Sequence, residues 1–377
     1  MARLGDVATY INGYAFKPSD WSDTGLPIIR IQDLTGNSYQ ANRYNGEYAL
    51  KYEVNKGDVL ISWSASLGVY VWQGDKALLN QHIFKVVFDK IEISKSFFVY
   101  QVESILEKAA SEVHGATMKH LTKPVFDALT FYLPSLDEQQ KIAAVLDKIS
   151  GLITKHRQQL DKLDELVKSR FIEMFGEPEN NNKAWPVKSL DKLCTVGSSK
   201  RVYQSEQSSE GVPFWRISDL VSKIDTGTVD SALFISEIKY TELKRAGLVP
   251  VTGDILVTSR GTLGRCYIIQ DEDCFYFQDG MISWLSNYSE EITPLYLQYL
   301  FTMSGFRKQI DNTQAGSTVA YLSIAMLKKL QVMVPDKALQ EQFAAFVAQT
   351  DKSKLAIKQS LEKLETLKKS LMQHYFG

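Results

Sequence analysis

One long segment occurs twice in this chain, and this repeat constrains the fold more than any other feature. Residues Pro134–Gly176 reappear as Pro335–Gly377, in the same register and without a gap. Matched positions run the whole length, from the two opening prolines through Gln139 and Gln340 to the closing Phe-Gly pairs. A repeat of this length indicates a duplicated architecture.

Each copy is predicted to form one long helix. A proline opens each copy, where its missing N–H costs nothing, and a glycine closes each copy, as in a left-handed cap. Apolar residues recur at heptad spacing, which is typical of a coiled-coil seam. We therefore expect an antiparallel pair of coiled-coil-like helices that bury the seam against each other or a partner. The predicted seam consists of Ile142, Val145, Ile149, Leu152, Leu163, Leu166, Phe343, Phe346, Ile357, Leu364 and Leu367.

The regions outside the repeat are predicted to be two related units, residues 1–133 and 186–334, joined through the polar, proline-bounded linker 177–185. Sequence landmarks recur in them in the same order. A GxPxxRIxDL pattern begins at Gly25 and at Gly211, a GD(V/I)L pattern follows at Gly57 and Gly253, and G(A/S)T turns come last, at residues 115–117 and 316–318.

Alternating apolar residues between the landmarks predict short strands, and each unit then carries a helical pattern. The predicted fold is therefore mixed α/β, with two similar domains, two long helices and an internal pseudo-twofold repeat. The predicted strands are 27–31, 59–62, 69–72 and 83–88 in the first unit and 213–217, 255–258, 266–269 and 281–285 in the second; the helices are 95–112 and 294–311.

Composition limits the classes of function. The net charge is −1, from 43 basic and 44 acidic residues, which argues mildly against a stand-alone nucleic-acid binder. Three cysteines without a CxxC pair fit a reducing compartment. The first ten residues lack the apolar core of a signal peptide, and no apolar stretch is long enough to span a membrane. We therefore expect a cytoplasmic protein.

Catalytic and metal-binding motifs are absent from the sequence. There is no GxGxxG, no GxxxxGK(S/T), no HExxH and no Pro-Pro-aromatic motif, and the five histidines have no metal-ligand spacing. We expect no metal, no cofactor on this chain and no catalytic residue. One rival pattern is a metal-dependent nuclease core, in which Glu237 and Lys239 follow Asp225 or Asp230.

The order of α/β unit, helix, α/β unit and helix resembles the specificity (S) subunit of type I restriction–modification systems. The GxPxxRIxDL, GD(V/I)L and G(A/S)T segments and the two helices carry this resemblance, which covers essentially the whole chain. It implies target-recognition domains at 1–133 and 186–334, with 134–176 and 335–377 as conserved helical spacers. It also implies a non-catalytic subunit that recognises an asymmetric bipartite site in double-stranded DNA.

The same resemblance implies partner proteins. Two methyltransferase (M) subunits would dock on the helices, carry S-adenosylmethionine and methylate adenine N6, and restriction (R) subunits would join through them. Two alternatives remain open at this stage: a specificity subunit of another methylase-dependent restriction class, and a protein–protein scaffold with two α/β jaws.

Candidate DNA contacts are side chains that hydrogen-bond bases or phosphates and lie in polar loops or on the shared landmarks. Arg30 and Arg216 occupy the same landmark position, so they cannot explain different targets and are predicted to be structural or phosphate-binding. The candidates are Arg30, Ser64, Ser66, Lys119, His120, Lys200, Arg201, Tyr203, Gln204, Arg216, Arg260, Thr262, Arg265 and Tyr321.

Overall fold

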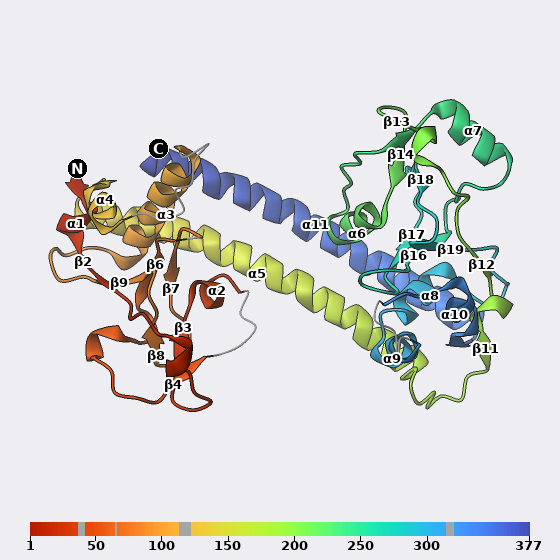
Figure 1. Ribbon diagram of the computed structural model, residues 1–377, viewed down its shortest axis with the longest axis horizontal. Helices are drawn as coiled ribbons and strands as arrows, with labels where there is room; N and C mark the ends of the chain where they lie inside the picture. The colour runs from red at the N-terminus through yellow and green to blue at the C-terminus, as the bar shows by residue number, and fades with distance from the viewer. Residues whose placement is uncertain (37–41, 65, 113–121, 314–319) are drawn as a thin grey trace. The chain divides into compact units, whose positions relative to one another are not determined.

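The computed structural model describes residues 1–36, 42–64, 66–112, 122–313 and 320–377 (Figure 1). The chain divides into two compact units. Unit 1 comprises Met1–Gln158 and Lys358–Gly377, and unit 2 comprises Gln159–Ile357. The division falls inside both long helices, so each unit contains an α/β part together with one portion of each helix.

Unit 1 contains two four-stranded sheets and a two-stranded ribbon. The first sheet is antiparallel, in the order β2-β9-β6-β7, and the second has the order β4-β3-β8-β5, in which β3 and β8 run parallel. The ribbon pairs β1 with β10. The strands are β1 (Ala2–Arg3), β2 (Thr9–Asn12), β3 (Leu26–Ile29), β4 (Arg43–Tyr44), β5 (Glu53–Val54), β6 (Val59–Ser62), β7 (Gly68–Val71), β8 (Ala77–Leu79), β9 (Ile83–Val87) and β10 (Thr130–Phe131).

Unit 2 repeats this plan. Its antiparallel sheet has the order β12-β19-β16-β17, its second sheet has the order β13-β15-β14-β18, and β11 pairs with β20. The strands are β11 (Val187–Ser189), β12 (Thr195–Gly197), β13 (Gln207–Ser208), β14 (Val212–Trp215), β15 (Phe234–Ile235), β16 (Ile255–Thr258), β17 (Cys266–Ile268), β18 (Tyr276–Phe277), β19 (Ile282–Ser286) and β20 (Gln331–Met333).

The second sheets of the two units share their centre and differ at one edge. Each has a parallel central pair, β3 with β8 or β14 with β18, and an antiparallel neighbour, β4 or β15. In unit 1 the fourth strand, β5, adds beside β8, whereas in unit 2 the fourth strand, β13, adds beside β15. The second sheets of the two units therefore share a central framework but end in different edge strands.

Helices differ between the units more than strands do. Unit 2 has α7 between β15 and β16, where unit 1 has only a short 3-10 turn, η2 (Leu50–Tyr52). The helices of unit 1 are α1 (Leu4–Val7), η1 (Pro18–Asp20), α2 (Ile31–Leu34), α3 (Lys95–Glu112) and α4 (Lys123–Ala128); those of unit 2 are η3 (Leu190–Lys192), η4 (Gln204–Glu206), α6 (Ile217–Thr226), α7 (Glu237–Arg245), α8 (Pro294–Leu300), α9 (Ser304–Asn312) and α10 (Ile324–Lys329).

The duplicated RIxDL landmark is a helix start. The backbone N–H of Arg30 donates to the Asp33 carboxylate at 2.7 Å, and that of Arg216 donates to Asp219 at 2.8 Å. Such bonds satisfy backbone donors that the first helical turn leaves without partners. The landmark therefore marks the passage from β3 into α2 and from β14 into α6.

The duplicated GD landmark is a tight turn before β6 and β16. Asp58 accepts the N–H of Asn55 at 2.8 Å, and Asp254 accepts that of Val251 at 2.9 Å. The glycine before each aspartate has a positive φ, which a side chain would strain. Burial raises the pKa of Asp254, whose carboxylate also accepts the Trp284 indole N–H.

The glutamine shared by the two long helices ties each helix to its unit. In unit 1 the Gln139 side chain accepts the N–H of Ser94 at 3.0 Å and donates to the Pro134 carbonyl. In unit 2 the Gln340 side chain accepts the N–H of Thr293 at 2.8 Å and donates to the equivalent proline carbonyl. Both glutamines are buried. The repeat thus preserves a hydrogen-bonded joint as well as a helical seam.

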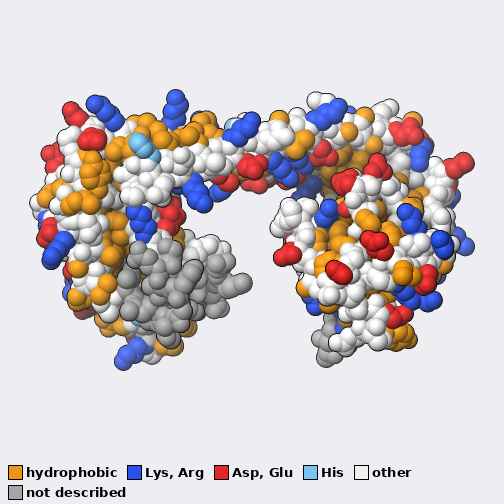
Figure 2. Space-filling view, turned by 90° about the horizontal axis from the view of Figure 1, so that it is seen from above, with side chains coloured by type: hydrophobic (Ala, Val, Ile, Leu, Met, Phe, Trp, Pro, Cys, Tyr) orange, Lys and Arg blue, Asp and Glu red, His pale blue; other side chains and the backbone are white. Residues whose placement is uncertain are grey.

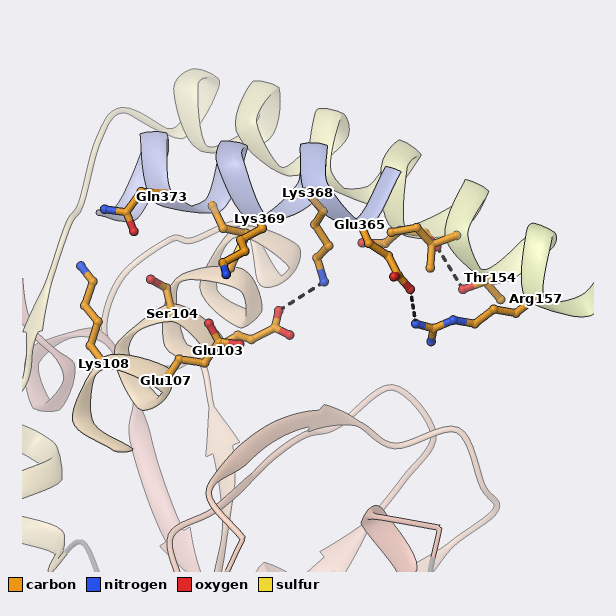
Figure 3. A pocket seen from close by; sticks show the side chains of 13 residues that line it. Glu103, Ser104, Glu107, Lys108, Thr154, Arg157, Glu365, Lys368, Lys369 and Gln373 are labelled. Atoms are coloured by element: carbon orange, nitrogen blue, oxygen red, sulfur yellow. Dashed lines mark hydrogen bonds and ion pairs between the residues drawn. The ribbon is translucent and has the colours of Figure 1, made fainter. Parts of the chain in front are cut away.

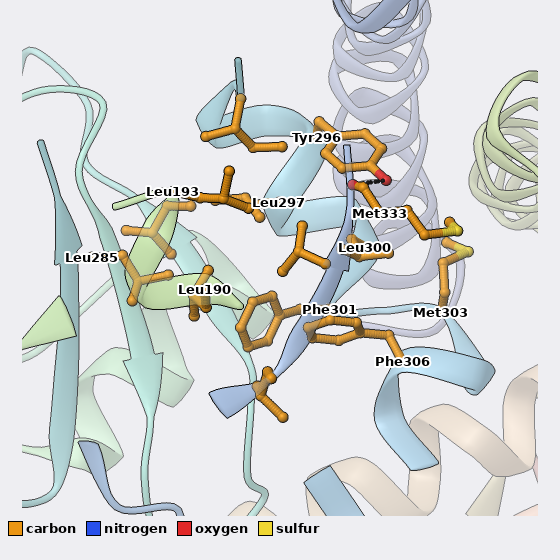
Figure 4. Packing of buried hydrophobic residues seen from close by; sticks show 14 of the residues in the cluster. Leu190, Leu193, Leu285, Tyr296, Leu297, Leu300, Phe301, Met303, Phe306 and Met333 are labelled. Carbon is orange, nitrogen blue, oxygen red and sulfur yellow. Dashed lines mark hydrogen bonds between the residues drawn. The ribbon is translucent and has the colours of Figure 1, made fainter. Parts of the chain in front are cut away.

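The core of unit 2 lies between its antiparallel sheet, the helices α8 and α9 and the long helices. Figure 4 shows Leu297, Leu300 and Phe301 packed together, with the Tyr296 hydroxyl donating to the Met333 carbonyl at 3.0 Å. The predicted single helix 294–311 is two helices here, because the chain breaks at residues 301–303, where Thr302 donates to the Tyr299 carbonyl.

The two long helices are α5 (Leu136–Phe175) and α11 (Lys337–Phe376). Within each unit they pack antiparallel. In unit 1 the start of α5 shares a core with the end of α11, and the His156 ring lies 2.9 Å from the Ser360 hydroxyl. In unit 2 the end of α5 meets the start of α11, where the rings of Phe171 and Phe343 lie edge to face. The predicted long antiparallel helices are confirmed.

The predicted seam is wrong by one residue at several positions. From Ile142 the buried positions of α5 advance by four and then three residues, so Leu146 and Ile153 are buried, whereas Val145 and Leu152 are exposed. Val145 and Leu146 are both apolar, as are Leu152 and Ile153, so heptad spacing fits a seam built from either member of each pair. Packing in the structure buries the second member of each pair, and we call this choice the later phase. The same correction applies to Leu166, which is exposed beside buried Val167.

The remaining predicted seam residues are buried or half-buried, with one further exception in α11. Leu367 is exposed, and the stem of half-buried Lys368 takes the inward position, with its ammonium 5.5 Å from the centre of the Tyr100 ring. The predicted positions that are buried or half-buried are Ile142, Ile149, Leu163, Phe343, Phe346, Ile357 and Leu364.

Candidate DNA interface

Two loops of unit 2 that were predicted to contact DNA are fixed to a common neighbour. The neighbour is the turn between β18 and β19, residues 278–281. From the loop after β12, Ser198 donates to the Ile282 carbonyl at 2.9 Å and accepts the Gly280 N–H. From the loop after β16, the N–H of Ser259 donates to the Met281 carbonyl at 2.9 Å. These bonds make the two loops and the turn one continuous surface.

Arg260 and Tyr321 meet on this surface although they are far apart in the sequence. They form an isolated antiparallel bridge, and the Arg260 guanidinium lies 4.9 Å from the centre of the Tyr321 ring. Arg260 is exposed and Tyr321 is half-buried. When a guanidinium stacks on an aromatic ring, the N–H groups at the edge of the guanidinium remain available as donors. These N–H groups can donate to O6 and N7 of guanine.

Two other candidate arginines are paired with carboxylates. Arg201 contacts Asp279 at 2.8 Å, and Arg265 binds Asp225 through both terminal nitrogens. The hydrogen bonds from Arg265 lower the pKa of Asp225, and the same bonds raise the pKa of Arg265. A phosphate offers the same paired oxygens as a carboxylate. Each guanidinium therefore already makes contacts of the kind that a phosphate could make, and a role for these arginines in binding DNA stays a prediction.

The other unit 2 candidates are exposed on the same loops or at the start of α6. The backbone of Lys200 exchanges hydrogen bonds with the Tyr276 hydroxyl, which fixes the loop from below. The backbone N–H of Tyr203 donates to Glu206, and its side chain is 63 % exposed. Five exposed candidates are thereby presented at the surface, namely Lys200, Tyr203, Gln204, Arg216 and Thr262.

Unit 1 places Arg30 in a structural environment. Its guanidinium lies 4.4 Å from the centre of the Trp21 ring, and the Asn42 amide, with its oxygen facing the guanidinium, accepts bonds of 2.9 and 3.1 Å. Arg30 is half-buried, whereas Arg216 at the same landmark position is exposed. The shared position therefore has different surroundings in the two units.

Among the described residues after β6 in unit 1, fewer are exposed than at the corresponding positions in unit 2. Ser64, which aligns with Arg260, is only 4 % exposed, so its predicted role as a surface DNA contact is wrong for this conformation. Ser66 is exposed, and its carbonyl accepts the Ser62 hydroxyl. Lys119 and His120 lie outside the described residues.

The face of unit 2 drawn in Figure 2 carries both signs of charge. Figure 2 shows lysine and arginine side chains interspersed with aspartate and glutamate over the visible face of unit 2. Within the ranges that the structure describes, no three His, Cys, Asp or Glu residues are grouped to hold a metal ion. Helices in the same ranges are too short or too polar to cross a membrane. Because basic and acidic side chains are interspersed on the visible face of unit 2, any DNA binding there must rest on local groups of arginines.

Comparison with known families assigns this architecture. The family model of the type I restriction modification DNA specificity domain matches residues 1–165 and again 182–368. The two matches together cover most of the chain, and each contains one α/β region and most of one long helix. This chain belongs to that family.

Relatives of this specificity subunit are distant in sequence and are matched over most of their length. It is 24% identical over 369 residues to the type I restriction enzyme EcoBI specificity subunit of Escherichia coli, covering 90% of this chain and 76% of the relative. It is 22% identical over 391 residues to the MjaVIII specificity subunit of Methanocaldococcus jannaschii, covering 99% and 90%.

A solved structure supports the fold. The type I restriction-modification S subunit from M. genitalium matches 100% of this chain and 95% of its own, with a TM-score of 0.56 and 16% identity. A second chain, from a study of complex assembly and conformational transition in the type I system, matches 100% and 96% with the same TM-score and 15% identity. The two-unit mixed α/β fold with long helices is thus that of type I S subunits.

The residues of the rival nuclease pattern are engaged elsewhere in this specificity subunit. Asp225 pairs with Arg265, and Lys239 pairs with Glu206 at 2.6 Å. Glu237 is exposed at the first position of α7. These pairings do not assemble the arrangement that the nuclease pattern predicted.

Sequence reasoning missed the partners that orient the candidate arginines. Asp279 lies 78 residues from Arg201, and Asp225 lies 40 residues from Arg265, so no local pattern connects them. The same holds for Trp21 and Asn42 beside Arg30. The RIxDL duplication was a usable signal for the framework, but it contains no information on these pairings.

The helical part of unit 1 carries a charged groove. A cavity of about 690 Å³ lies between α3, α5 and α11 (Figure 3). Arg157 contacts Glu365 at 2.7 Å along its wall, and Lys368 lies 3.7 Å from Glu103. The first pair joins α5 to α11 and the second joins α11 to α3, although exposed pairs of this kind contribute little stability.

Proposed function

We propose that this specificity subunit recognises an asymmetric, bipartite site in double-stranded DNA, with one half-site read by each α/β unit. We assign residues 1–133 and 186–334 as the two target-recognition domains, with the linker at 177–185. The proposal places the complex in the cytoplasm, where its DNA would be.

The comparison of the two units carries the proposal. They share the strand order of the antiparallel sheet, their capped helix starts and their glutamine joints, but they differ at the edges of the second sheet and in the loop after β6 or β16. There, unit 1 has buried Ser64 and unit 2 has exposed Arg260. A shared framework with different exposed side chains is what two readers of different sequences require, because base edges are distinguished by the side chains that reach them.

The long helices supply the proposed docking surface for two adenine-N6 methyltransferase subunits. Val145, Leu152 and Leu166 recur at heptad intervals along α5 outside the buried seam, and each is more than a third exposed. A stripe of apolar residues at this period fits a partner helix. The partner subunits would carry S-adenosylmethionine, and restriction subunits would join through them. This chain itself would be non-catalytic and hold no cofactor.

The test is methylated-base mapping of host DNA with the gene intact, deleted, or carrying Arg260→Ala. We expect deletion to abolish one bipartite N6-methyladenine motif. We expect Arg260→Ala to weaken or relax recognition in the unit 2 half-site and to leave the other half-site unchanged. A methylome unaffected by deletion, in cells that express the methyltransferase, would refute the proposed function.

A matched control is provided by Lys328, an exposed cation on α10 of the same unit. Lys328→Ala removes one positive charge from unit 2 without altering the Arg260–Tyr321 pair. We expect this variant to leave both half-sites unchanged. If Lys328→Ala relaxed the same half-site as Arg260→Ala, the assignment of base reading to Arg260 would be wrong.

A further inference from the structure

Unit 2 contains a cavity of about 480 Å³ that lies between α6, the loop after β16 and the helices α8 and α9. A cavity of this volume can hold a small organic ligand. Apolar and aromatic side chains share its wall with hydrogen-bonding groups and two arginines. The wall includes Ile224, Arg265, Gln298, Tyr299, Thr302 and Arg307.

Arg307 supplies the unmatched positive charge of this cavity. It is half-buried, and its Nη2 donates to the Leu263 carbonyl at 2.8 Å, which fixes the guanidinium against the loop. Its Nη1 lies beside Gly264, where an ideal Cβ atom would be 3.9 Å away. Among the residues that the structure describes, no carboxylate pairs with Arg307, whereas Arg265 is already paired with Asp225. The remaining N–H groups of Arg307 are therefore donors for an anionic ligand.

The rest of the wall suits a ligand with a larger body than a bare anion. The side chains of Ile224 and Tyr299 offer apolar surface to a flat ring. The amide oxygen of Gln298 remains an acceptor, because the amide nitrogen donates to the Cys266 carbonyl at 3.4 Å. Burial raises the pKa of the Cys266 thiol, so this group is neutral and adds no negative charge. A molecule that carries both a phosphate and a ring therefore matches the two parts of the wall.

Unit 1 has different chemistry at the corresponding positions. Counting along α3 and α8 from the residues that donate to the shared glutamine, Val99 stands in the place of Gln298 and Glu103 in the place of Thr302. The Glu103 carboxylate lies 3.7 Å from the Lys368 ammonium. A carboxylate at this position would repel a phosphate. The cavity is therefore a feature of unit 2 and does not belong to the duplicated framework.

We propose that this cavity binds a nucleotide, with its phosphate on Arg307 and its ring against Ile224 and Tyr299. The guanidinium offers paired N–H donors to phosphate oxygens, and burial of the ring adds affinity. The nucleotide comes either from solution or from the DNA that unit 2 is proposed to bind, and the chemistry is the same for both sources. The proposal requires neither base reading by Arg260 nor a methyltransferase partner.

The test is isothermal titration calorimetry of the intact chain with AMP, adenosine and inorganic phosphate. We expect one site for AMP with a Kd below about 1 mM, and binding at least tenfold weaker for adenosine and for phosphate. Arg307→Gln should weaken AMP binding at least tenfold. Arg245→Gln, on an exposed arginine in the last turn of α7, is the matched control and should bind AMP normally.

A second pair of variants keeps the test decisive if loss of the contact between Arg307 and Leu263 disturbs the loop. Thr302→Glu places a carboxylate in the cavity, as Glu103 does at the corresponding position of unit 1, and it should weaken AMP binding at least tenfold. Thr302→Gln has a similar size without the charge, and it should weaken AMP binding less than threefold.

A duplex that contains the methylome-mapped site distinguishes the two sources, when it is added to the chain in its methyltransferase complex. Displacement of AMP by the duplex would assign the nucleotide to DNA, and simultaneous binding of both would assign it to solution. The proposal is overturned by absence of saturable AMP binding, by equal affinity for AMP and adenosine or for AMP and phosphate, or by equal losses with Arg307→Gln and Arg245→Gln. AMP binding together with a methylome unaffected by gene deletion would refute the proposed function alone.

Discussion

Replacing Gln340 by alanine removes the hydrogen-bonded joint between α11 and the rest of unit 2. The Gln340 oxygen accepts the N–H and the hydroxyl of Thr293, at 2.8 and 3.1 Å. Its nitrogen donates to the carbonyls of Glu291 and Pro335, each at 2.8 Å. The side chain is 1% exposed, so water cannot replace these bonds without opening the structure.

The expected cost follows from these bonds. A net contribution of about 1 kcal/mol per hydrogen bond, with partners left buried, gives about 3–4 kcal/mol for Gln340→Ala. A change of this size lowers the unfolding midpoint of a unit of this length by roughly 6–16 °C. Gln139→Ala removes the two bonds to Ser94 and Pro134, so we expect about 2 kcal/mol in unit 1.

The chain offers a matched control beside each glutamine. Gln342 and Gln140 are exposed on the same helices, and their replacement by alanine should change stability by about 0.5 kcal/mol or less. Urea unfolding and calorimetry of the four variants measure the difference, and hydrogen exchange at the Thr293 amide locates it. If Gln340→Ala matched Gln342→Ala within about 1 kcal/mol, the joint would not stabilise unit 2 as argued.

Three further predictions test the helices and the arginine pairs. Ile153→Ala should destabilise unit 1 by about 2–4 kcal/mol in urea unfolding, whereas Leu152→Ala, on the exposed neighbour, should cost less than about 1 kcal/mol; equal costs would contradict the corrected seam. Asp225→Asn should tighten DNA binding by the methyltransferase complex and steepen its salt dependence, because Arg265 then binds phosphate without displacing a carboxylate. Since Arg265 lowers the pKa of Asp225, this carboxylate is charged throughout the range from about pH 6 to about pH 8, and the gain in DNA affinity should be constant over that range. A gain in affinity that disappeared toward about pH 8 would contradict this explanation. Inserting four residues near Thr154 in α5, with four at the level of Ser360 in α11, should lengthen each helix by about 6 Å and the recognised gap by about two base pairs in methylome mapping; altered half-sites would contradict the spacer role.

The long helices illustrate what spacing in the sequence can predict. The heptad pattern, the opening prolines and the closing glycines indicated both helices, and their duplication indicated a repeated fold. The phase of the seam was not determined, because Val145–Leu146, Leu152–Ile153 and Leu166–Val167 are pairs of apolar neighbours. Only contact with the α/β part and the opposing helix decides which member of each pair is buried.

The candidate DNA interface divides in the same way. Residue chemistry and loop position were enough to name Arg201, Arg260 and Arg265 as candidates. Their states were not predictable, because Asp279, Tyr321 and Asp225 reach them from distant segments. Ser64 was misplaced for the same reason, since burial of a short polar side chain depends on what packs over its loop.

The sequence by itself determined the repeat, the order of α/β units and helices, and the family, because these depend on periodicity and on landmarks that are local in the chain. The tertiary structure alone decided which residues of the long helices form the buried seam and which carboxylates pair with the arginines. These depend on contacts between residues far apart in sequence, whose free energies are set by burial and by the geometry of the partners.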